Sequence, residues 1–281
     1  MITKISDIKE LEIKAYEIRL ETIKMLGKAG SGHAAGPMGM ADIFTTLYFN
    51  WAKLDPQNPE WSERDYILLS NGHICPIWYA VLGVAGFFPK AEMDSLRKIN
   101  SLLQGHPKVS IPGVENSSGP LGHGLSQAIG IALGLKMDDK PNRVICLMSD
   151  GEHQEGQVWE AVMSANKWKL GNLIAIMDNN GMQIEGTTNE IMPLGDLKEK
   201  YEAFGWNVII IDGHDFEQIL IALDRADIAD TPTMIIANTI GGKGVRFMED
   251  GGWKYHDWKG EPGDTEKAIA DIEWRLGELK G

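Results

Sequence analysis

The sequence predicts an α/β fold, a doubly wound parallel sheet flanked by helices. Five short apolar runs without alternation have the pattern of strands that are covered on both faces. Segments of helical length lie between these runs, and this alternation implies right-handed crossovers rather than a sandwich. The predicted strands are residues 66–69, 144–148, 173–177, 208–211 and 233–237.

Helices are predicted before, between and after the strands. A first helix near the N-terminus carries two apolar stripes, one through Leu11 and Ile18 and the other through Tyr16 and Ile23, which predicts burial on both sides. Asp264 is predicted to cap a last helix. The helices predicted between strands are residues 75–86, 123–137, 157–169, 194–204 and 216–226.

The composition fits one globular unit. The 281 residues are 43% hydrophobic and no linker divides them, so we treat residues 1–281 as a single domain. A formal net charge of −13 disfavours nucleic acids and anionic lipid as partners. Apolar runs such as residues 173–177 and 208–211 have four to five residues, whereas a membrane span needs about 20. No secretory signal pattern is present and Cys146 lies in an apolar run, so we interpret the protein as cytoplasmic.

Acidic and amide residues follow two of the predicted strands. Asp150 and Gly151 come shortly after residues 144–148, and Asn180 and Met182 follow residues 173–177. Ligands of open α/β sheets bind outside the carboxyl ends of strands, and one crossover helix would bring Asn180 beside Asp150. A carboxylate, an amide oxygen and a main-chain carbonyl suit Mg²⁺ or Ca²⁺ better than zinc. For an isolated Asp-Gly pair, a helix cap followed by a turn is the alternative interpretation.

The spacing of these two motifs resembles the thiamine-diphosphate-binding motif. The resemblance extends over almost the whole chain and matches the N-terminal, diphosphate-binding half of transketolase, which predicts the thiamine-diphosphate-binding fold. The blocks that carry it, in transketolase order, are Ser31-Gly32-His33, Leu69-Ser70-Asn71-Gly72-His73, Gly105-His106-Pro107, Gly119-Pro120-Leu121-Gly122, Asp150-Gly151-Glu152-His153-Gln154-Glu155-Gly156, Gly171-Asn172-Leu173-Ile174-Ala175-Ile176 and Asn238-Thr239-Ile240 with the later Gly242-Lys243-Gly244 and His256.

The resemblance implies a site for thiamine diphosphate with Mg²⁺ or Ca²⁺. In the family pattern, Asp150 and Asn180 bind the metal through their side chains and Met182 through its carbonyl. Cofactor-binding roles are implied for His73, Gly119, Leu121, Gly151, Glu155, Asn180 and His256. Glu155 matches a glutamate that joins a carboxylate network between two cofactor sites.

His33, His106 and His256 are implied to be catalytic, because they match histidines that polarise the donor carbonyl and move protons. The implied reaction transfers a two-carbon ketol unit from a ketose, expected to be phosphorylated, to an aldose. Transketolases are more than twice this length, and the glutamate that activates the cofactor's pyrimidine ring lies in their other half. We therefore expect a two-component transketolase that is active only with a C-terminal subunit, in a two-plus-two heterotetramer.

Some residues depart from the family pattern. His123 and His153 stand where other residues are usual, and they are candidate donors near the cofactor or the partner. His214 is predicted to lie in a turn or at a helix start outside the site, whereas Lys243 is assigned equally to phosphate contact or to a flexible surface. The alternatives to transketolase are another thiamine enzyme, resembling deoxyxylulose-phosphate synthase or a 2-oxo acid dehydrogenase subunit, and a non-catalytic cofactor-binding regulatory homologue.

Overall fold

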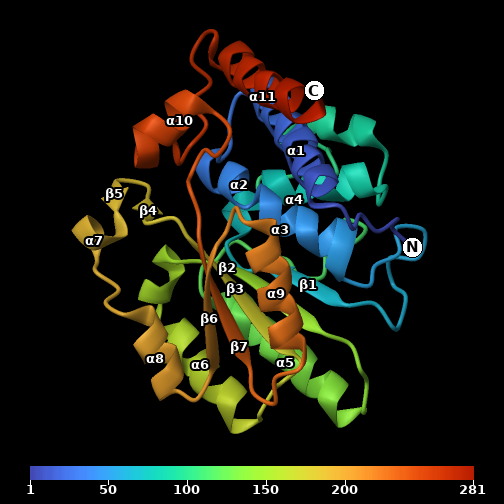
Figure 1. The fold of residues 1–281 in the computed structure, drawn as a ribbon, viewed down its shortest axis with the longest axis vertical. Helices are drawn as coiled ribbons and strands as arrows, with labels where there is room; N and C mark the ends of the chain where they lie inside the picture. Colours follow the sequence, from blue (N-terminus) through green and yellow to red (C-terminus); the bar gives the residue numbers. More distant parts are fainter.

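A five-stranded parallel sheet forms the centre of the protein (Figure 1), as described by a computed structural model of residues 1–281. The strand order is β1-β2-β3-β7-β6, and all four neighbouring pairs are parallel. All five predicted strands are confirmed, each extended by at most two residues. The strands are β1 (Tyr66–Leu69), β2 (Val144–Ser149), β3 (Leu173–Asn179), β6 (Asn207–Asp212) and β7 (Thr233–Asn238).

Helices cover both faces of this sheet (Figure 1). The helices are α1 (Ile8–Ala29), α2 (Ala35–Gly39), α3 (Ala41–Thr46), α4 (Cys75–Ala85), α5 (His123–Met137), α6 (Gly156–Lys167), α7 (Thr188–Ile191), α8 (Leu197–Ala203), α9 (Phe216–Asp227), α10 (Arg246–Gly251) and α11 (Asp264–Lys280). A small antiparallel hairpin, β4 (Met182–Gln183) with β5 (Gly186–Thr187), follows β3. None of the helices combines the length and the apolarity that a membrane span needs.

The sheet separates two hydrophobic cores because successive side chains of a strand point to opposite faces. In β2, Ile145 and Leu147 belong to the larger core, whereas Cys146 and Met148 belong to the smaller one. Helices α1, α3, α4, α9 and α11 contribute to the larger core, and α5, α6 and α8 to the smaller. The buried-strand pattern in the sequence reflects this coverage of both faces.

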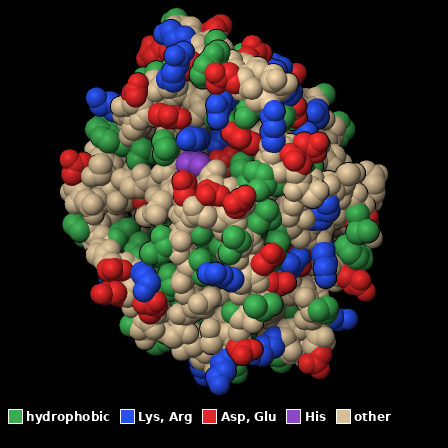
Figure 2. Space-filling view, viewed as in Figure 1, with side chains coloured by type: hydrophobic (Ala, Val, Ile, Leu, Met, Phe, Trp, Pro, Cys, Tyr) green, Lys and Arg blue, Asp and Glu red, His purple; other side chains and the backbone are tan.

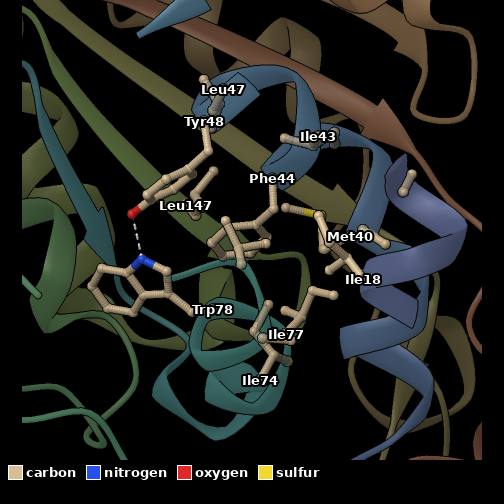
Figure 3. Close-up of a cluster of buried hydrophobic side chains, with 14 of the residues drawn as sticks. Ile18, Met40, Ile43, Phe44, Leu47, Tyr48, Ile74, Ile77, Trp78 and Leu147 are labelled. Carbon is tan, nitrogen blue, oxygen red and sulfur yellow. Dashed lines mark hydrogen bonds between the residues drawn. The ribbon is translucent and has the colours of Figure 1, made fainter. Parts of the chain in front are cut away.

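Figure 3 shows part of the larger core, where α3 and α4 meet β2. Trp78 of α4 is fully buried, and its indole Nε1 donates to the Tyr48 hydroxyl at 2.6 Å. Phe44 and Leu147 lie in the same cluster. This packing fixes α4, whose first residue follows shortly after His73.

The first helix packs against the larger core along both predicted stripes. Leu11 and Ile18 are fully buried, as is Ile23, and α1 lies against α3, α4 and α11. In the second stripe Tyr16 and Ile23 are buried, whereas Ile13 and Leu20 are only partly buried, so the expected two-plus-two assembly stays a prediction. At the other end of the chain, the predicted cap is wrong, because Asp264 is the first residue of α11 and Gly263 is its N-cap.

A buried ion pair ties α1 to α3. Both terminal nitrogens of Arg19 donate to the Asp42 carboxylate, at 2.8 and 2.7 Å. His214 completes the cluster: Ile240 N donates to its Nε2 at 2.8 Å, so its Nδ1 carries the proton and donates to Asp42 at 2.7 Å. Burial raises the pKa of Asp42, but Arg19 and the hydrogen bonds outweigh it and lower that pKa to about 2. His214 lies in a turn outside the site, as predicted, and has a structural role there.

On the face shown in Figure 2, positively and negatively charged side chains are mixed. Basic side chains are scattered among acidic ones there and form no continuous patch. Histidine atoms reach this face beside acidic side chains.

Candidate active site

A cleft of about 550 Å³ lies at the carboxyl ends of β2 and β3. This is the edge at which open α/β sheets bind ligands. Ten of the predicted site residues line it: His33, His73, His106, Gly119, Leu121, Gly151, Glu155, Asn180, Met182 and His256. Asp150 is 1% exposed and lies beneath the cleft.

Three of the histidines form a cluster although they come from distant segments. The ring centroids of His33 and His73 are 4.8 Å apart, and His256 lies 5.3 Å from each. A short antiparallel bridge places His33 beside the His256 segment: Ala34 N donates to His256 O at 3.1 Å and Trp258 N donates to Gly32 O at 2.8 Å.

His106 lies on the neighbouring wall of the cleft. A Cβ atom on Gly119 would lie 3.4 Å from His106 Cδ2, so the imidazole rests against that glycine. The two cleft-lining segments are joined by a hydrogen bond from Ser118 N to Pro107 O at 3.3 Å.

Burial keeps these imidazoles uncharged at neutral pH. It lowers the pKa of His33 to about 4, and the neighbouring His256 adds to the effect. The pKa values of His73, His106 and His256 are also lowered, in each case mainly by burial. His33 Nδ1 is buried without a hydrogen-bond partner, whereas its Nε2 lies 3.2 Å from Asp257 Oδ1. A neutral imidazole offers one donor and one acceptor, which suits hydrogen bonds to sugar hydroxyl and carbonyl groups.

The parallel pairing of β2 with β3 brings the two acidic and amide motifs together. Ser149 is in register with Asp178, so the residues that follow each strand meet. Asp150 accepts hydrogen bonds from Gly151 N and Gly181 N, both at 2.7 Å. The predicted proximity of Asp150 and the Asn180 turn is therefore present.

The oxygens gathered here fit a divalent cation. Asp150 is buried without a cationic partner, and burial raises its pKa to about 6. Asn180 Oδ1 accepts from Met182 N at 2.9 Å, which keeps an amide oxygen beside the Met182 main chain. Carboxylate, amide and carbonyl oxygens are the ligands that Mg²⁺ and Ca²⁺ prefer, and a bound cation would compensate the buried carboxylate.

Sequence reasoning missed Asp178, the last buried residue of β3. Its carboxylate accepts from Asn180 Nδ2 at 2.8 Å and from the Thr239 hydroxyl, and burial raises its pKa to about 7. The bond to Asn180 orients the side-chain amide so that Oδ1 points away from Asp178. Asp178 directly follows the apolar run of residues 173–177, but nothing in the spacing along the chain indicates that it orients Asn180.

The Gly151 N–H makes a different hydrogen bond from the one the resemblance implies. The Gly151 N–H, implied to bind diphosphate, donates to Asp150 in this structure. Gln183 Nε2 lies 2.8 Å from where a Gly151 Cβ would stand and donates to Gln154 Oε1 at 2.8 Å. The diphosphate role of Gly151 therefore stays a prediction that requires its N–H to leave Asp150.

The two unusual histidines do not join the site. His153 is buried in the smaller core, where Nδ1 is 2.9 Å from Ser149 O and Nε2 is 2.8 Å from the Tyr201 hydroxyl. The expectation that it is a donor near the cofactor is wrong, because the short helical turn after Asp150 directs it into the core. His123 is exposed outside the cleft, with Nδ1 3.1 Å from Leu121 O, and Lys243 lines a different hollow, beside Tyr16.

Comparisons with known proteins agree with this geometry. Residues 11–262 match the family described as transketolase, thiamine diphosphate binding domain. The chain is 41% identical over 266 residues to the 6-deoxy-6-sulfo-D-fructose transketolase subunit SqwG of Clostridium sp. (strain MSTE9), covering 94% of this chain and 96% of that protein. It is 35% identical over 274 residues to an apulose-4-phosphate transketolase subunit of Phocaeicola vulgatus, covering 97% of each chain.

A solved structure shows the same fold in a longer chain. Transketolase from Campylobacter jejuni superimposes with a TM-score of 0.86 at 31% identity, covering 98% of this chain and 48% of that one. The chain thus spans about half of that transketolase and nearly the full length of the two subunits. It belongs to the transketolase family, as a thiamine diphosphate-binding domain.

Proposed function

We propose that this chain is the N-terminal subunit of a two-component transketolase, which with a second chain transfers a two-carbon ketol unit from a ketose to an aldose. The observation that carries the proposal is the cleft, where uncharged histidines stand beside buried metal-type oxygens. The near full-length match to two transketolase subunits supports a divided enzyme.

Asp150, Asn180 and the Met182 carbonyl would hold Mg²⁺ or Ca²⁺, and Gly151 with His73 and His256 would donate to the diphosphate of thiamine diphosphate. Bound there, the cofactor supplies the nucleophilic carbon that carries the two-carbon unit. Gly119 and Leu121 would contact its rings from one side.

The histidines would orient the sugars and move protons. Because His33, His106 and His256 are uncharged near pH 7, each can accept a proton from a hydroxyl and return it to a carbonyl oxygen. The Asp257 carboxylate near His33 Nε2 favours an imidazole of fixed orientation, and it leaves Nδ1 without a partner inside the chain.

The partner would complete the cleft from the side of Glu155, which is exposed at its edge. Helix α5 starts next to the cleft, and Gly130 and Gly134 of this helix have open space where a Cβ would stand. Each helical glycine costs about 0.5–1 kcal/mol relative to alanine, with no compensating contact inside the chain. A second chain that approaches this face closely explains both glycines.

The donor would be a sugar with an anionic terminus. The two subunit relatives are named for a sulfonated ketose and for a sugar phosphate, which supports this substrate class. Three ketoses that end in phosphate, sulfonate or hydroxyl, assayed in parallel with the assembled enzyme, test this. We expect the neutral ketose to be the poorest donor.

Reconstitution tests the proposal as a whole. The purified chain is assayed with thiamine diphosphate and Mg²⁺, alone and with a candidate C-terminal chain that carries the pyrimidine-side carboxylate. Ketol transfer is expected only in the mixture. Full transfer by the isolated chain refutes the divided site, and carbon dioxide release from pyruvate by the mixture assigns it to a decarboxylating thiamine enzyme.

A further inference from the structure

A buried carboxylate that the proposed chemistry does not use lies next to the cleft. Glu152 is 0% exposed and accepts hydrogen bonds from three separate segments. Ser149 N donates to Oε2 at 2.8 Å, Gly122 N donates to Oε1 at 3.1 Å, and the Ser70 hydroxyl donates to Oε1. The Ser149 hydroxyl adds a longer contact to Oε2 at 3.3 Å. Every partner is a donor, so the group acts only as an acceptor.

These bonds supply a cap that helix α5 lacks. Its N-cap is Gly122, which has no side chain, and the first N–H groups of a helix have no partner inside the helix. Gly122 N donates to Glu152, and Gly124 N donates to the Ser70 hydroxyl at 3.1 Å. A carboxylate at a helix N-terminus is also favoured by the helix dipole. The ends of β1 and β2 therefore provide the cap from outside α5.

Two glycines at the start of α5 allow it to approach the residues that follow β1 closely. A Cβ on Gly124 would lie 2.4 Å from the Ser70 Cβ, so only glycine fits there. Gly122 has φ +80°, in the left-handed region that glycine adopts without strain. Gly122 directly follows the Gly119–Leu121 turn, which lines the cleft, and Gly124 comes two residues later.

We propose that Glu152 is a positioning residue for the cofactor site, holding the turn that carries Gly119 and Leu121 against the ends of β1 and β2. The inference rests on the proposed function, since the role of the turn is to contact bound thiamine diphosphate. The same carboxylate fixes Ser70, three residues before His73. One side chain thus sets the relative position of the cleft segments that follow β1 and β2 and that precede α5.

Two variants test this. Glu152→Gln keeps the shape but turns one oxygen into an NH₂ group that faces a donor, and Ser70→Ala removes only the bridging hydroxyl. Leu223→Ala, in the fully buried part of α9 on the other face of the sheet, serves as a control of reduced stability. Glu273→Gln, on the exposed face of α11, controls for the loss of a charge.

The first readout needs no cofactor. Hydrogen exchange of the full chain is measured at residues 119–125, where Glu152→Gln is expected to speed exchange at least tenfold relative to Leu223→Ala. Ser70→Ala should change exchange in the same direction but less, and it keeps the test available if Glu152→Gln does not fold. Unchanged exchange in both variants overturns the inference.

The second readout is the affinity of the assembled two-chain enzyme for thiamine diphosphate with Mg²⁺, by calorimetry. The dissociation constant is expected to rise at least tenfold in Glu152→Gln, with a smaller loss of kcat at saturating cofactor, and to stay within twofold in both controls. An equal rise in Leu223→Ala assigns the effect to stability and overturns the positioning role. Absence of binding by the wild-type enzyme contradicts the proposed function instead, and leaves the exchange measurement to decide on Glu152.

Discussion

The helices on the two faces of the sheet are covered by the rest of the chain to different degrees. On the larger-core face, α1 is covered by α3, α4 and α11, and the Arg19–Asp42 ion pair is sealed inside. On the smaller-core face, α5 and α6 leave Gly130 and Gly134 open, and Met137 and Met163 are 75% and 58% exposed. Gly130, Gly134 and Met137 share one side of α5 by their spacing. Helix α11 on the first face also has an open glycine, Gly277, and exposes Trp274 by 60%. We therefore propose the second face for the partner because α5 starts beside the cleft, and not on exposure alone.

The largest expected effect is a loss of stability when the buried ion pair on the larger-core face is broken. Asp42→Ala removes the carboxylate that compensates buried Arg19, and loss of one partner of such a pair costs about 3–5 kcal/mol of unfolding free energy. Denaturant unfolding measures it, with Asp250→Ala on exposed α10 as the control. A loss below about 1 kcal/mol would show that this face does not depend on the ion pair.

A substitution in α5, on the smaller-core face, should weaken binding of the C-terminal chain rather than folding of this chain. Gly134→Trp places a large side chain where the partner is expected, and its affinity for the C-terminal chain should fall at least tenfold, or about 1.4 kcal/mol. Sedimentation or calorimetry of the two chains measures this, with unfolding of the isolated chain as the control. Unimpaired assembly would remove α5 from the interface.

The unfolding free energy of the chain should depend on pH through His33, which lines the cleft. The pKa of His33 is lowered from 6.5 to about 4, so the unfolded chain binds more protons in this window. Stability from this residue is complete above pH 6.5 and is lost as the pH falls toward 4. Relative to His33→Gln, the wild-type chain should lose about 1–2 kcal/mol across this window, allowing for solvent screening. Parallel unfolding profiles of the two proteins would contradict the buried, uncharged state of His33.

The smallest expected effect is a gain in stability. Gly134→Ala should stabilise the isolated chain by about 0.5–1 kcal/mol, because the helix loses a flexible residue and the added methyl meets open space. Thermal unfolding of the isolated chain measures this, and Gly124→Ala is the opposite control, since its methyl would collide with Ser70. Destabilisation by Gly134→Ala would mean that the glycine serves the fold.

Strands and the site edge could be predicted because their causes are local. Buried parallel strands require apolar runs, and parallel pairing alone brings the residues after β2 and β3 together. The short helix α2 was missed because Gly36, Pro37 and Gly39 interrupt any helical pattern, and α3 was missed because its six residues are too few to show one. They form because their residues are buried by α1 and α4.

The remaining site features depend on distant contacts. Glu152 and His153 are adjacent in the sequence, yet Glu152 meets Ser70 and Gly122, whereas His153 meets Tyr201. No spacing rule along the chain distinguishes these two neighbours, because their partners come from other loops. The roles of the histidines and of Gly151 in catalysis stay predictions.

A crystal structure of the assembled enzyme with thiamine diphosphate and Mg²⁺ would show directly whether the ends of β2 and β3 hold the cofactor. We expect a cation bound by Asp150, Asn180 and the Met182 carbonyl, with the diphosphate on it and the cofactor rings covered by the second chain. A fully occupied cofactor whose diphosphate lies away from Asp150 and Asn180 would contradict it.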